Sequence, residues 1–394
     1  MNNINKQKQA VMYGAGNIGR GFIAQLFYES GYETTFIDVN KELIDLINEK
    51  KEYPIKFADN ESSREILIKN IRAVNGSAEN LDEVADIISK ADIMAVSVGV
   101  NILKFIMKPV AAGLNKRFND KNFTPFNIIL CENLIDSDKI AYTGILKYID
   151  DEYKDLYDKK IGFVQASVGR VVPTQTDETK AGNPLRIVTE NYTKLQVDKD
   201  GFKDKLPDIK NIDAYSPFKY IIERKLYIYN MGHAVCAYLG DIAGYEYIWQ
   251  AIKDDYIKEI VGKAMRYTGM ALEKIYGEFD FNYADDLIRR FANKSLGDTV
   301  KRVGNDLQRK LSPNDRIIGA YKICLENKLP LNHICLAIAA AVNFKGDKLS
   351  GQNLENILIA AGSYDLISEI PENFELIKKY DDMIKQKIRV IPFC

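Results

Sequence analysis

The pattern of apolar and polar positions changes character about halfway along the chain. In the first 200 residues, short apolar runs alternate with stretches in which apolar residues recur every three or four positions. Such alternation is typical of βαβ units, in which helices cover both faces of a parallel sheet. The pattern predicts strands at 9–13, 34–39, 92–99, 126–133 and 161–168 and helices at 17–31, 41–50, 101–118 and 136–149, and it leaves 53–74 undecided, with extra strands as one interpretation.

Beyond residue 200 a polar stretch with a proline, 201–213, resembles a connection, and no convincing strand follows it. We therefore expect an α/β N-terminal domain, 1–200, with a Rossmann-type doubly wound parallel sheet, and a mostly α-helical C-terminal domain, 201–394. Two domains also suit the length of 394 residues, because single cores stop growing at roughly 250–300 residues. The predicted helical segments of the second domain are 217–240, 244–276, 284–294, 313–327, 331–343, 352–361 and 371–388.

Composition removes several classes of function. The net charge is -1, so nothing favours a nucleic-acid partner. No targeting segment and no apolar run near the roughly 20 residues of a membrane span is visible, so we expect a cytoplasmic protein. The cysteines are scattered, which favours reduced thiols. Scattered cysteines and only two histidines also argue against a structural zinc site. The five cysteines are Cys131, Cys236, Cys324, Cys335 and Cys394.

The stretch "YGAGNIGRG" carries Gly14, Gly16 and Gly19 in the GxGxxG spacing, between a predicted strand and a predicted helix. Asp38 follows at the end of the next strand, where an acid can accept hydrogen bonds from an adenosine ribose. The first glycine permits the tight turn, the second lets backbone approach the pyrophosphate, and the third lets the helix pack closely. Asp38 would repel a 2′-phosphate, which favours NAD over NADP; a glycine turn without a ligand is the alternative. The expected NAD contacts are Gly14, Gly16, Asn17, Ile18, Gly19, Asp38, Val98 and Asn133.

Val98 and Asn133 follow later strands, and ligands of open parallel sheets lie beyond the carboxyl ends of strands. Asn133 is therefore a candidate for the nicotinamide or substrate end of the site. A helix N-cap or turn residue is an equally good interpretation of that asparagine.

The stretch "KLYIYNMGHAV" places three hydrogen-bonding side chains in an otherwise apolar helical segment. At about 100° per residue, Asn230 and His233 lie at about 140° and about 80° from Lys225, within one arc. A dehydrogenase needs a base that titrates near neutral pH, and burial or a nearby cation would lower the lysine pKa from its usual 10.4 or so. Lys225 could then act as acid and base, Asn230 could stabilise an alkoxide, and His233 could orient a hydroxyl. A solvated helix face is the competing interpretation.

Five motifs together resemble the polyol-specific long-chain dehydrogenases, also called the mannitol dehydrogenase family. They are "GAGNIGRG", "CEN", "VGRVVP", "ERKLYIYNMGHAVCAYLG" and "RVGNDLQRKLSPNDR", and the resemblance covers nearly the whole chain. It implies a Rossmann domain, a helical domain, a site in the cleft and no metal. It also implies that Lys225 is the general acid/base, that Asn133 and Asn230 polarise the reacting oxygen, and that His233 binds substrate. The implied reaction is the NAD-dependent interconversion of mannitol 1-phosphate and fructose 6-phosphate.

One position departs from the family pattern, because "VGRVVP" has Gly169 where members usually carry an aspartate. The missing carboxylate leaves the polyol preference open, and a cavity there could hold water or another side chain. A sugar phosphate also needs cations. We expect Arg302 and Arg309 to bind it, with a solvated charged loop as the alternative for each cation of the basic stretch that also includes Lys310 and Arg316.

The partner expected from the resemblance is thus a small sugar phosphate, with neither nucleic acid nor membrane; a monomer is the working expectation for the assembly. A related enzyme for an unphosphorylated polyol or a hexuronate such as fructuronate is the runner-up. A NAD-binding regulatory protein without catalysis is the third interpretation, favoured only by Gly169.

Overall fold

The computed structural model describes residues 7–58, 63–132, 134, 136–173, 175–277, 279–280 and 282–388. The chain forms two compact units, Met1–Ile221 and Ile222–Cys394. The division falls later than the expected 200/201, because the polar connection ends in a strand that belongs to the sheet of the first unit. That strand is β11, Ile212–Tyr215.

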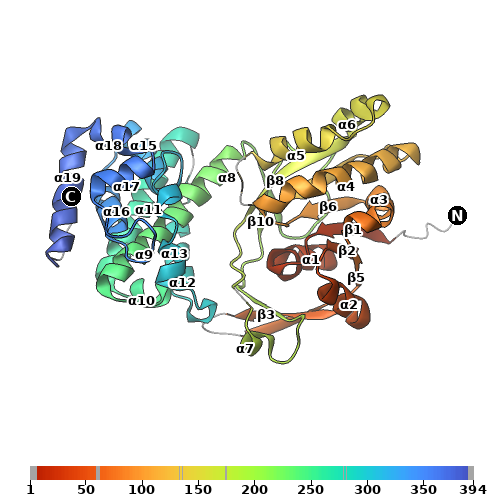
Figure 1. Ribbon diagram of the computed structural model, residues 1–394, viewed down its shortest axis with the longest axis horizontal. Coiled ribbons are helices and arrows are strands. Elements are labelled where there is room, and N and C mark those ends of the chain that lie inside the picture. The colour runs from red at the N-terminus through yellow and green to blue at the C-terminus, as the bar shows by residue number, and fades with distance from the viewer. Residues whose placement is uncertain are drawn as a thin grey trace. The chain divides into compact units, whose positions relative to one another are not determined.

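The first unit is built on a sheet of eight strands (Figure 1). All neighbouring strands run parallel except the pair β8 and β10. The strands predicted from the sequence are present in this sheet, and its topology is the expected Rossmann type. In sheet order the strands are β11, β10 (Leu195–Asp198), β8 (Ile161–Val168), β7 (Phe126–Leu130), β6 (Ile93–Val96), β1 (Lys8–Tyr13), β2 (Tyr32–Asp38) and β5 (Ile71–Asn75).

The chain order of the strands fixes where a ligand can bind. From β1 the chain first proceeds through β2 to β5, and it then returns to build β6, β7 and β8 on the other side of β1. The order reverses between β1 and β6, and this reversal point is where open α/β sheets bind dinucleotides. The loops after Tyr13 and Val96 border it.

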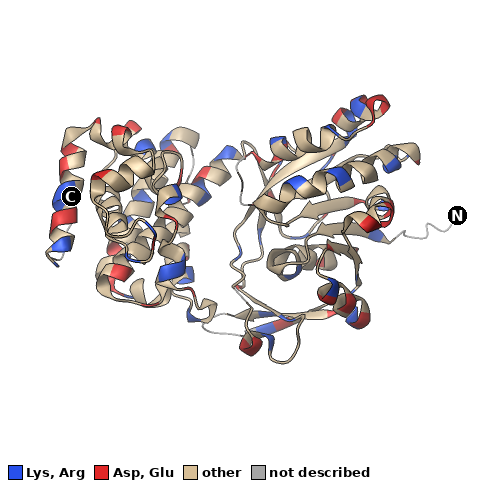
Figure 2. Ribbon diagram, in the orientation of Figure 1, with Lys and Arg blue, Asp and Glu red and all other residues tan. Residues whose placement is uncertain are grey.

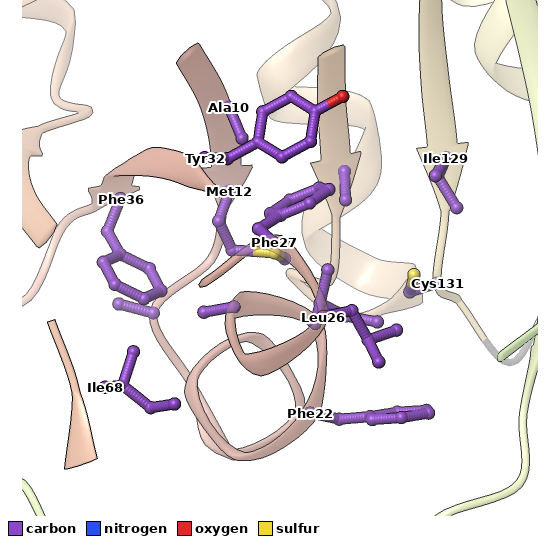
Figure 3. Close-up of a cluster of buried hydrophobic side chains, with 14 of the residues drawn as sticks. Ala10, Met12, Phe22, Leu26, Phe27, Tyr32, Phe36, Ile68, Ile129 and Cys131 are labelled. Atoms are coloured by element: carbon purple, nitrogen blue, oxygen red, sulfur yellow. The ribbon is translucent and has the colours of Figure 1, made fainter. Parts of the chain in front are cut away.

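Helices cover both faces of this sheet, as buried strands require. One core lies between the sheet, the π-turn η1 and helices α1 and α2; Figure 3 shows part of it, including Leu26 and Phe27 of α1 near Met12 of β1. The other core lies beneath α3, α4, α5 and α6. The bounds are η1 Gly19–Ile23, α1 Ala24–Glu29, α2 Lys41–Lys50, α3 Leu81–Lys90, α4 Val100–Asn119, α5 Ser137–Leu146, α6 Lys154–Lys160 and α7 Asp177–Lys180.

The undecided stretch 53–74 contains strands. β3 (Tyr53–Ala58) and β4 (Ser63–Ile68) form an antiparallel pair, and β9 (Ile187–Thr189) extends it to a second sheet of three strands. β5 instead joins the edge of the large sheet.

The described part of the second unit is helical, which confirms the expected class. Its longest helix, α11, begins with the Asp254 side chain as N-cap and ends before Gly277, which has the left-handed conformation common at helix ends. The bounds are α8 Lys219–Arg224, the π-turn η4 Lys225–Asn230, α9 Met231–Ala243, α10 Ile248–Ala251, α11 Asp255–Tyr276, α12 Asn282–Phe291, α13 Val300–Gly304, α14 Leu307–Lys310, α15 Arg316–Glu326, α16 Asn332–Val342, α17 Leu354–Ala360, α18 Tyr364–Ser368 and α19 Pro371–Lys385.

Charged side chains of both signs are interspersed along the helices, for example on α2 and α19 (Figure 2). Cys131, Cys236, Cys324 and Cys335 are buried and not bonded to one another, whereas Cys394 lies outside the described residues. Within the described ranges no helix is both long and apolar enough to cross a bilayer.

Candidate active site

The three glycines of the fingerprint differ in what surrounds them. Gly14 has φ of +99°, and a Cβ there would lie 2.4 Å from the Ser97 carbonyl oxygen. A Cβ on Gly19 would lie 2.1 Å from the Gly14 oxygen. Gly16 has no heavy atom within 4 Å of its Cβ position. Contacts within the protein therefore require the first and third glycines, whereas Gly16 borders open space.

Asp38 lies beside this turn. Its Oδ2 accepts a hydrogen bond from the Ala15 N–H at 2.7 Å, and its Oδ1 accepts one from the Asn40 N–H at 3.0 Å. A carboxylate oxygen has two acceptor positions, so each oxygen keeps one for a ribose hydroxyl. The turn thus fits a dinucleotide, because it combines a glycine that faces open space, a helix start and a carboxylate.

Three further predicted residues, Asn17, Ile18 and Val98, contact neighbouring segments. The Asn17 amide donates to the Pro173 carbonyl at 3.4 Å, and Ile18 packs against the core. The Val98 N–H donates at 2.7 Å to Glu132, a residue that the sequence analysis did not single out. Asn133 lies outside the described residues.

Glu132 joins the ends of β6 and β7. Its Oε1 accepts from the N–H groups of Val98 and Gly99, at 2.7 and 3.1 Å. Burial raises the pKa of Glu132, although these two hydrogen bonds oppose the shift. The carboxylate therefore fixes the loop after β6 at the ligand-binding edge of the sheet. Its place in the "CEN" string, directly before a candidate asparagine, was the available signal.

The space at Gly169 is filled by a side chain. A Cβ on Gly169 would lie 2.9 Å from Cε1 of the Tyr192 ring, so an aspartate there would require that ring to move. Of the two occupants expected, water and another side chain, the structure has the side chain.

The neighbouring Arg170 is buried and forms hydrogen bonds to η1 and α1, the helical segment that follows the glycine turn. Its Nη1 donates at 2.8 Å to the Gly21 carbonyl and to Gln25, and its guanidinium lies 4.2 Å from the centre of the Phe22 ring.

In the second unit, Lys225 and Asn230 are the first and last residues of a π-turn. The Met231 N–H donates to the Leu226 carbonyl, five residues back. This hydrogen bond widens the turn, so residues four and five apart share a face there, instead of three and four apart. Lys225 and Asn230 are five apart, and His233 follows Asn230 by three residues in α9. The three side chains therefore start from one face, more closely grouped than the regular helix assumed from the sequence would allow. π-turns occur frequently at functional sites.

Gly232 within α9 has a packing reason. A Cβ there would lie 2.5 Å from Sδ of Met265, so the glycine lets α9 lie close to α11. Because Met265 fills this side of the helix, Gly232 carries no indication of a bound ligand.

His233 is held by an acid and an aromatic ring. Its Nε2 lies 3.1 Å from Oδ2 of Asp298, and its ring stacks on Phe291 at 4.8 Å between centres, with 13° between the planes. Asp298 also accepts from Nε of Arg302 at 2.7 Å. Burial alone would raise the pKa of Asp298, but His233 and Arg302 outweigh burial and lower that pKa below its usual value. The sequence analysis did not single out Asp298.

The cations of the basic stretch have partners inside the second unit. Arg302 is paired with Asp298, and Arg309 with Asp306 and Asp315. Lys310 is buried and donates to the carbonyl oxygens of Val303 and Asn305, and Arg316 pairs with Asp315. Arg302 nevertheless remains 64% exposed, so its guanidinium is accessible. Among the described residues, no group of three His, Cys, Asp or Glu side chains is arranged to hold a metal ion.

Sheet order and glycine turn define a Rossmann-type nucleotide-binding unit, to which a helical unit is joined. The family model described as the mannitol dehydrogenase Rossmann domain matches residues 8–211, and the model of the mannitol dehydrogenase C-terminal domain matches 217–364. The chain therefore belongs to the mannitol dehydrogenase family.

Among curated proteins, the chain is similar to mannitol-1-phosphate 5-dehydrogenase of Geobacillus stearothermophilus. The two are 40% identical over 313 residues, which are 79% of this chain and 80% of that protein.

Solved structures share the fold at low sequence identity. D-sorbitol dehydrogenase in substrate-free form is 16% identical, with a TM-score of 0.80 over 96% of this chain and 93% of that one. Mannitol 2-dehydrogenase of Pseudomonas fluorescens, in a ternary complex with NAD and D-mannitol, is 15% identical, with a TM-score of 0.73 over 97% and 93%.

Proposed function

We propose that this protein catalyses the NAD-dependent interconversion of mannitol 1-phosphate and fructose 6-phosphate. One observation carries the proposal: a π-turn groups Lys225, Asn230 and His233 on one face of a helical unit. The similarity to a mannitol-1-phosphate 5-dehydrogenase supports the substrate. The open space at Gly16 and the carboxylate of Asp38 support NAD as the cofactor.

Bound NAD would accept the hydride that leaves the alcohol carbon. The residues of the chain handle the oxygen and its proton. Lys225 takes the hydroxyl proton during oxidation and returns it during carbonyl reduction. Asn230 donates a hydrogen bond to the oxygen as negative charge develops on it, and Asn133 is proposed to do the same. His233 binds a further hydroxyl of the substrate.

The cofactor contacts follow from the turn. The backbone of Gly14–Gly19, with Asn17 and Ile18, would bind the pyrophosphate at the start of the helix, and Val98 would line the nicotinamide end. Asp38 would accept hydrogen bonds from the ribose hydroxyls and would repel a 2′-phosphate, so NADH should be used in preference to NADPH.

For the phosphate we propose Arg302 and Arg309. Each already faces a carboxylate, so the phosphate has to compete with Asp298, Asp306 and Asp315 for these cations. This competition is the specific observation that favours the runner-up, an enzyme for an unphosphorylated polyol or hexuronate.

The discriminating experiment is NADH oxidation with fructose 6-phosphate and with fructose, measured side by side. The proposal expects kcat/KM to favour the phosphorylated ketose strongly. Equal values would identify the runner-up. Tight NADH binding without turnover on either sugar, or on fructuronate, would identify the regulatory protein.

The role of Lys225 is tested by Lys225→Ala, for which we expect kcat to fall by roughly 10²–10⁴-fold, the usual contribution of acid–base catalysis. NADH binding, measured by fluorescence titration, should be unchanged. Lys258→Ala, which removes an exposed lysine of α11, is the matched control and should keep full activity. A Lys225→Ala enzyme with the rate of the control would exclude Lys225 as the acid/base.

A further inference from the structure

Asp298 contacts both His233 of α9 and Arg302 of the basic stretch. Its two carboxylate oxygens have different partners: Oδ2 faces Nε2 of His233 at 3.1 Å, and Oδ1 accepts from Nε of Arg302 at 2.7 Å. The side chains of His233 and Asp298 are only 15% and 11% exposed. The contact is therefore largely shielded from water.

The backbone holds Asp298 in this place. Its carbonyl oxygen accepts from the Ile248 N–H at 2.9 Å, and the next residue, Thr299, caps α13 by accepting from the Arg302 N–H at 3.2 Å. The stack on Phe291 fixes the plane of the imidazole. Acid and ring thus both have defined positions before substrate arrives.

We propose that Asp298 is a positioning residue that sets the tautomer of His233. The assignment rests on the proposed function, because it concerns how His233 meets the substrate. A carboxylate paired with a guanidinium can only accept hydrogen bonds, so the ring nitrogen that faces it carries the hydrogen. In the neutral imidazole, Nδ1 then has the free lone pair.

The tautomer decides what His233 can bind. With Nδ1 as an acceptor, His233 receives a hydrogen bond from a hydroxyl of the polyol chain, a group that any hexitol or ketohexose phosphate offers several times. The opposite tautomer would present a donor and would select a carbonyl or an ether oxygen instead. Arg302 keeps Asp298 ionised and oriented. The Arg302 side chain itself is largely exposed to solvent.

Nitrogen-15 NMR of the imidazoles measures the tautomer directly and without turnover. The chain has two histidines, so the His333→Leu variant assigns both signals. In the pH range in which the spectrum itself shows a neutral ring, we expect His233 in the Nε2–H form, and we expect Asp298→Asn to shift it towards a mixture of tautomers. A neutral Nδ1–H form in the unaltered protein, or a spectrum unchanged by Asp298→Asn, would overturn the proposal.

Kinetics provide the second test. With fructose as the substrate, so that release of Arg302 from Asp298 cannot strengthen phosphate binding, loss of one well-placed acceptor should raise KM roughly 3- to 10-fold in Asp298→Asn, with KM for NADH unchanged. The double variant His233→Ala/Asp298→Asn should bind substrate no more weakly than His233→Ala, because the acid acts through the ring. Additive effects would overturn the proposal.

Asp286→Asn is the matched control, since it breaks an exposed aspartate–arginine pair on α12 that contains no histidine. It should leave KM and both imidazole signals unchanged. If fructose 6-phosphate is not a substrate at all, the proposed function fails, whereas the NMR result still decides the tautomer of His233.

Discussion

At the scale of single residues, the environment of each glycine distinguishes roles that the motif alone only suggests. Gly14 and Gly19 are required by contacts within the protein, with carbonyl oxygens 2.4 and 2.1 Å from their Cβ positions. Gly16 has no such neighbour. One motif therefore contains two glycines that the fold requires and one, Gly16, that we propose to contact the cofactor, and substitutions should separate the two.

We expect Gly16→Val to lower the affinity for NADH at least about tenfold, or about 1.4 kcal/mol, because the side chain would occupy the open space. Its melting temperature should stay near that of the unaltered protein. Gly19→Ala is the contrasting variant: overpacking against Gly14 should cost about 1–3 kcal/mol of unfolding free energy. Fluorescence titration and thermal unfolding measure both effects. A Gly16→Val protein that binds NADH normally would contradict the assignment.

Sequence patterns predicted the glycine turn, Asp38 and the group of Lys225, Asn230 and His233, because all of these are local in the chain. They could not predict Asp298 as the partner of His233. The two residues are far apart in sequence and meet only when the loop before α13 packs against α9. Likewise, nothing in "VGRVVP" indicated that the Tyr192 ring fills the space beside Gly169.

At the scale of elements, the sequence predicted the long, strongly periodic segments and missed the short ones. Helices such as α2 and α11 follow apolar periodicity and end at recognisable caps. β9, β10, α13 and α14 have five residues or fewer, too few for a period to be visible. The π-turn η4 was also not foreseen, because the pattern was interpreted with the regular helical angle.

Tyr227 of the π-turn packs against a glycine of α15. A Cβ on Gly319 would lie 2.2 Å from Cε1 of Tyr227, a residue of the turn. Gly319→Ala should therefore displace the turn, reduce kcat and cost about 1–3 kcal/mol of stability. Gly262→Ala, within α11, is the control: its nearest neighbour is the flexible end of Arg266, so helix propensity should make it neutral or stabilising by up to about 1 kcal/mol. Steady-state kinetics and denaturant unfolding measure the pair, and equal effects would contradict the packing role.

His333 in α16 makes this element sensitive to acid. Burial, with Lys263 nearby, lowers its pKa from 6.5 to about 4. Between pH 6.5 and about 4 the unfolded chain therefore binds this proton more readily than the folded protein does. The free energy of unfolding should be highest above pH 6.5 and should fall by up to about 3 kcal/mol as the pH drops towards 4. His333→Leu should flatten this part of the curve of unfolding free energy against pH. Superimposable curves for the two proteins would contradict the prediction.

At the scale of the whole molecule, the two units differ in chemistry. The first has two cores around a parallel sheet and the nucleotide-binding turn, and the second is helical and contains the proposed acid/base. Class, fold and family could be predicted from the sequence because alternation and motifs extend over nearly its whole length. The boundary between the units could not, because the polar connection conceals β11.

NADH should stabilise the first unit measurably. At a free NADH concentration of about 100 times Kd, mass action adds about 2.7 kcal/mol to the free energy of unfolding of the unit that binds it. Hydrogen exchange should therefore slow in peptides from residues 8–221, and the effect should disappear in Gly16→Val. Unchanged exchange throughout the first unit would show that NADH binds elsewhere.

The π-turn also changes what loss of one residue should do between Lys225 and Asn230. Residues five apart in a π-turn share a face, as residues four apart do in a regular helix. A deletion within the turn would therefore let the chain continue as a regular helix and would keep Lys225, Asn230 and His233 on one side. Loss of Met231 or Gly232 from the regular part, α9, would instead rotate His233 by about 100° relative to Lys225 and Asn230. The place of a deletion, more than its length, should therefore decide whether activity survives.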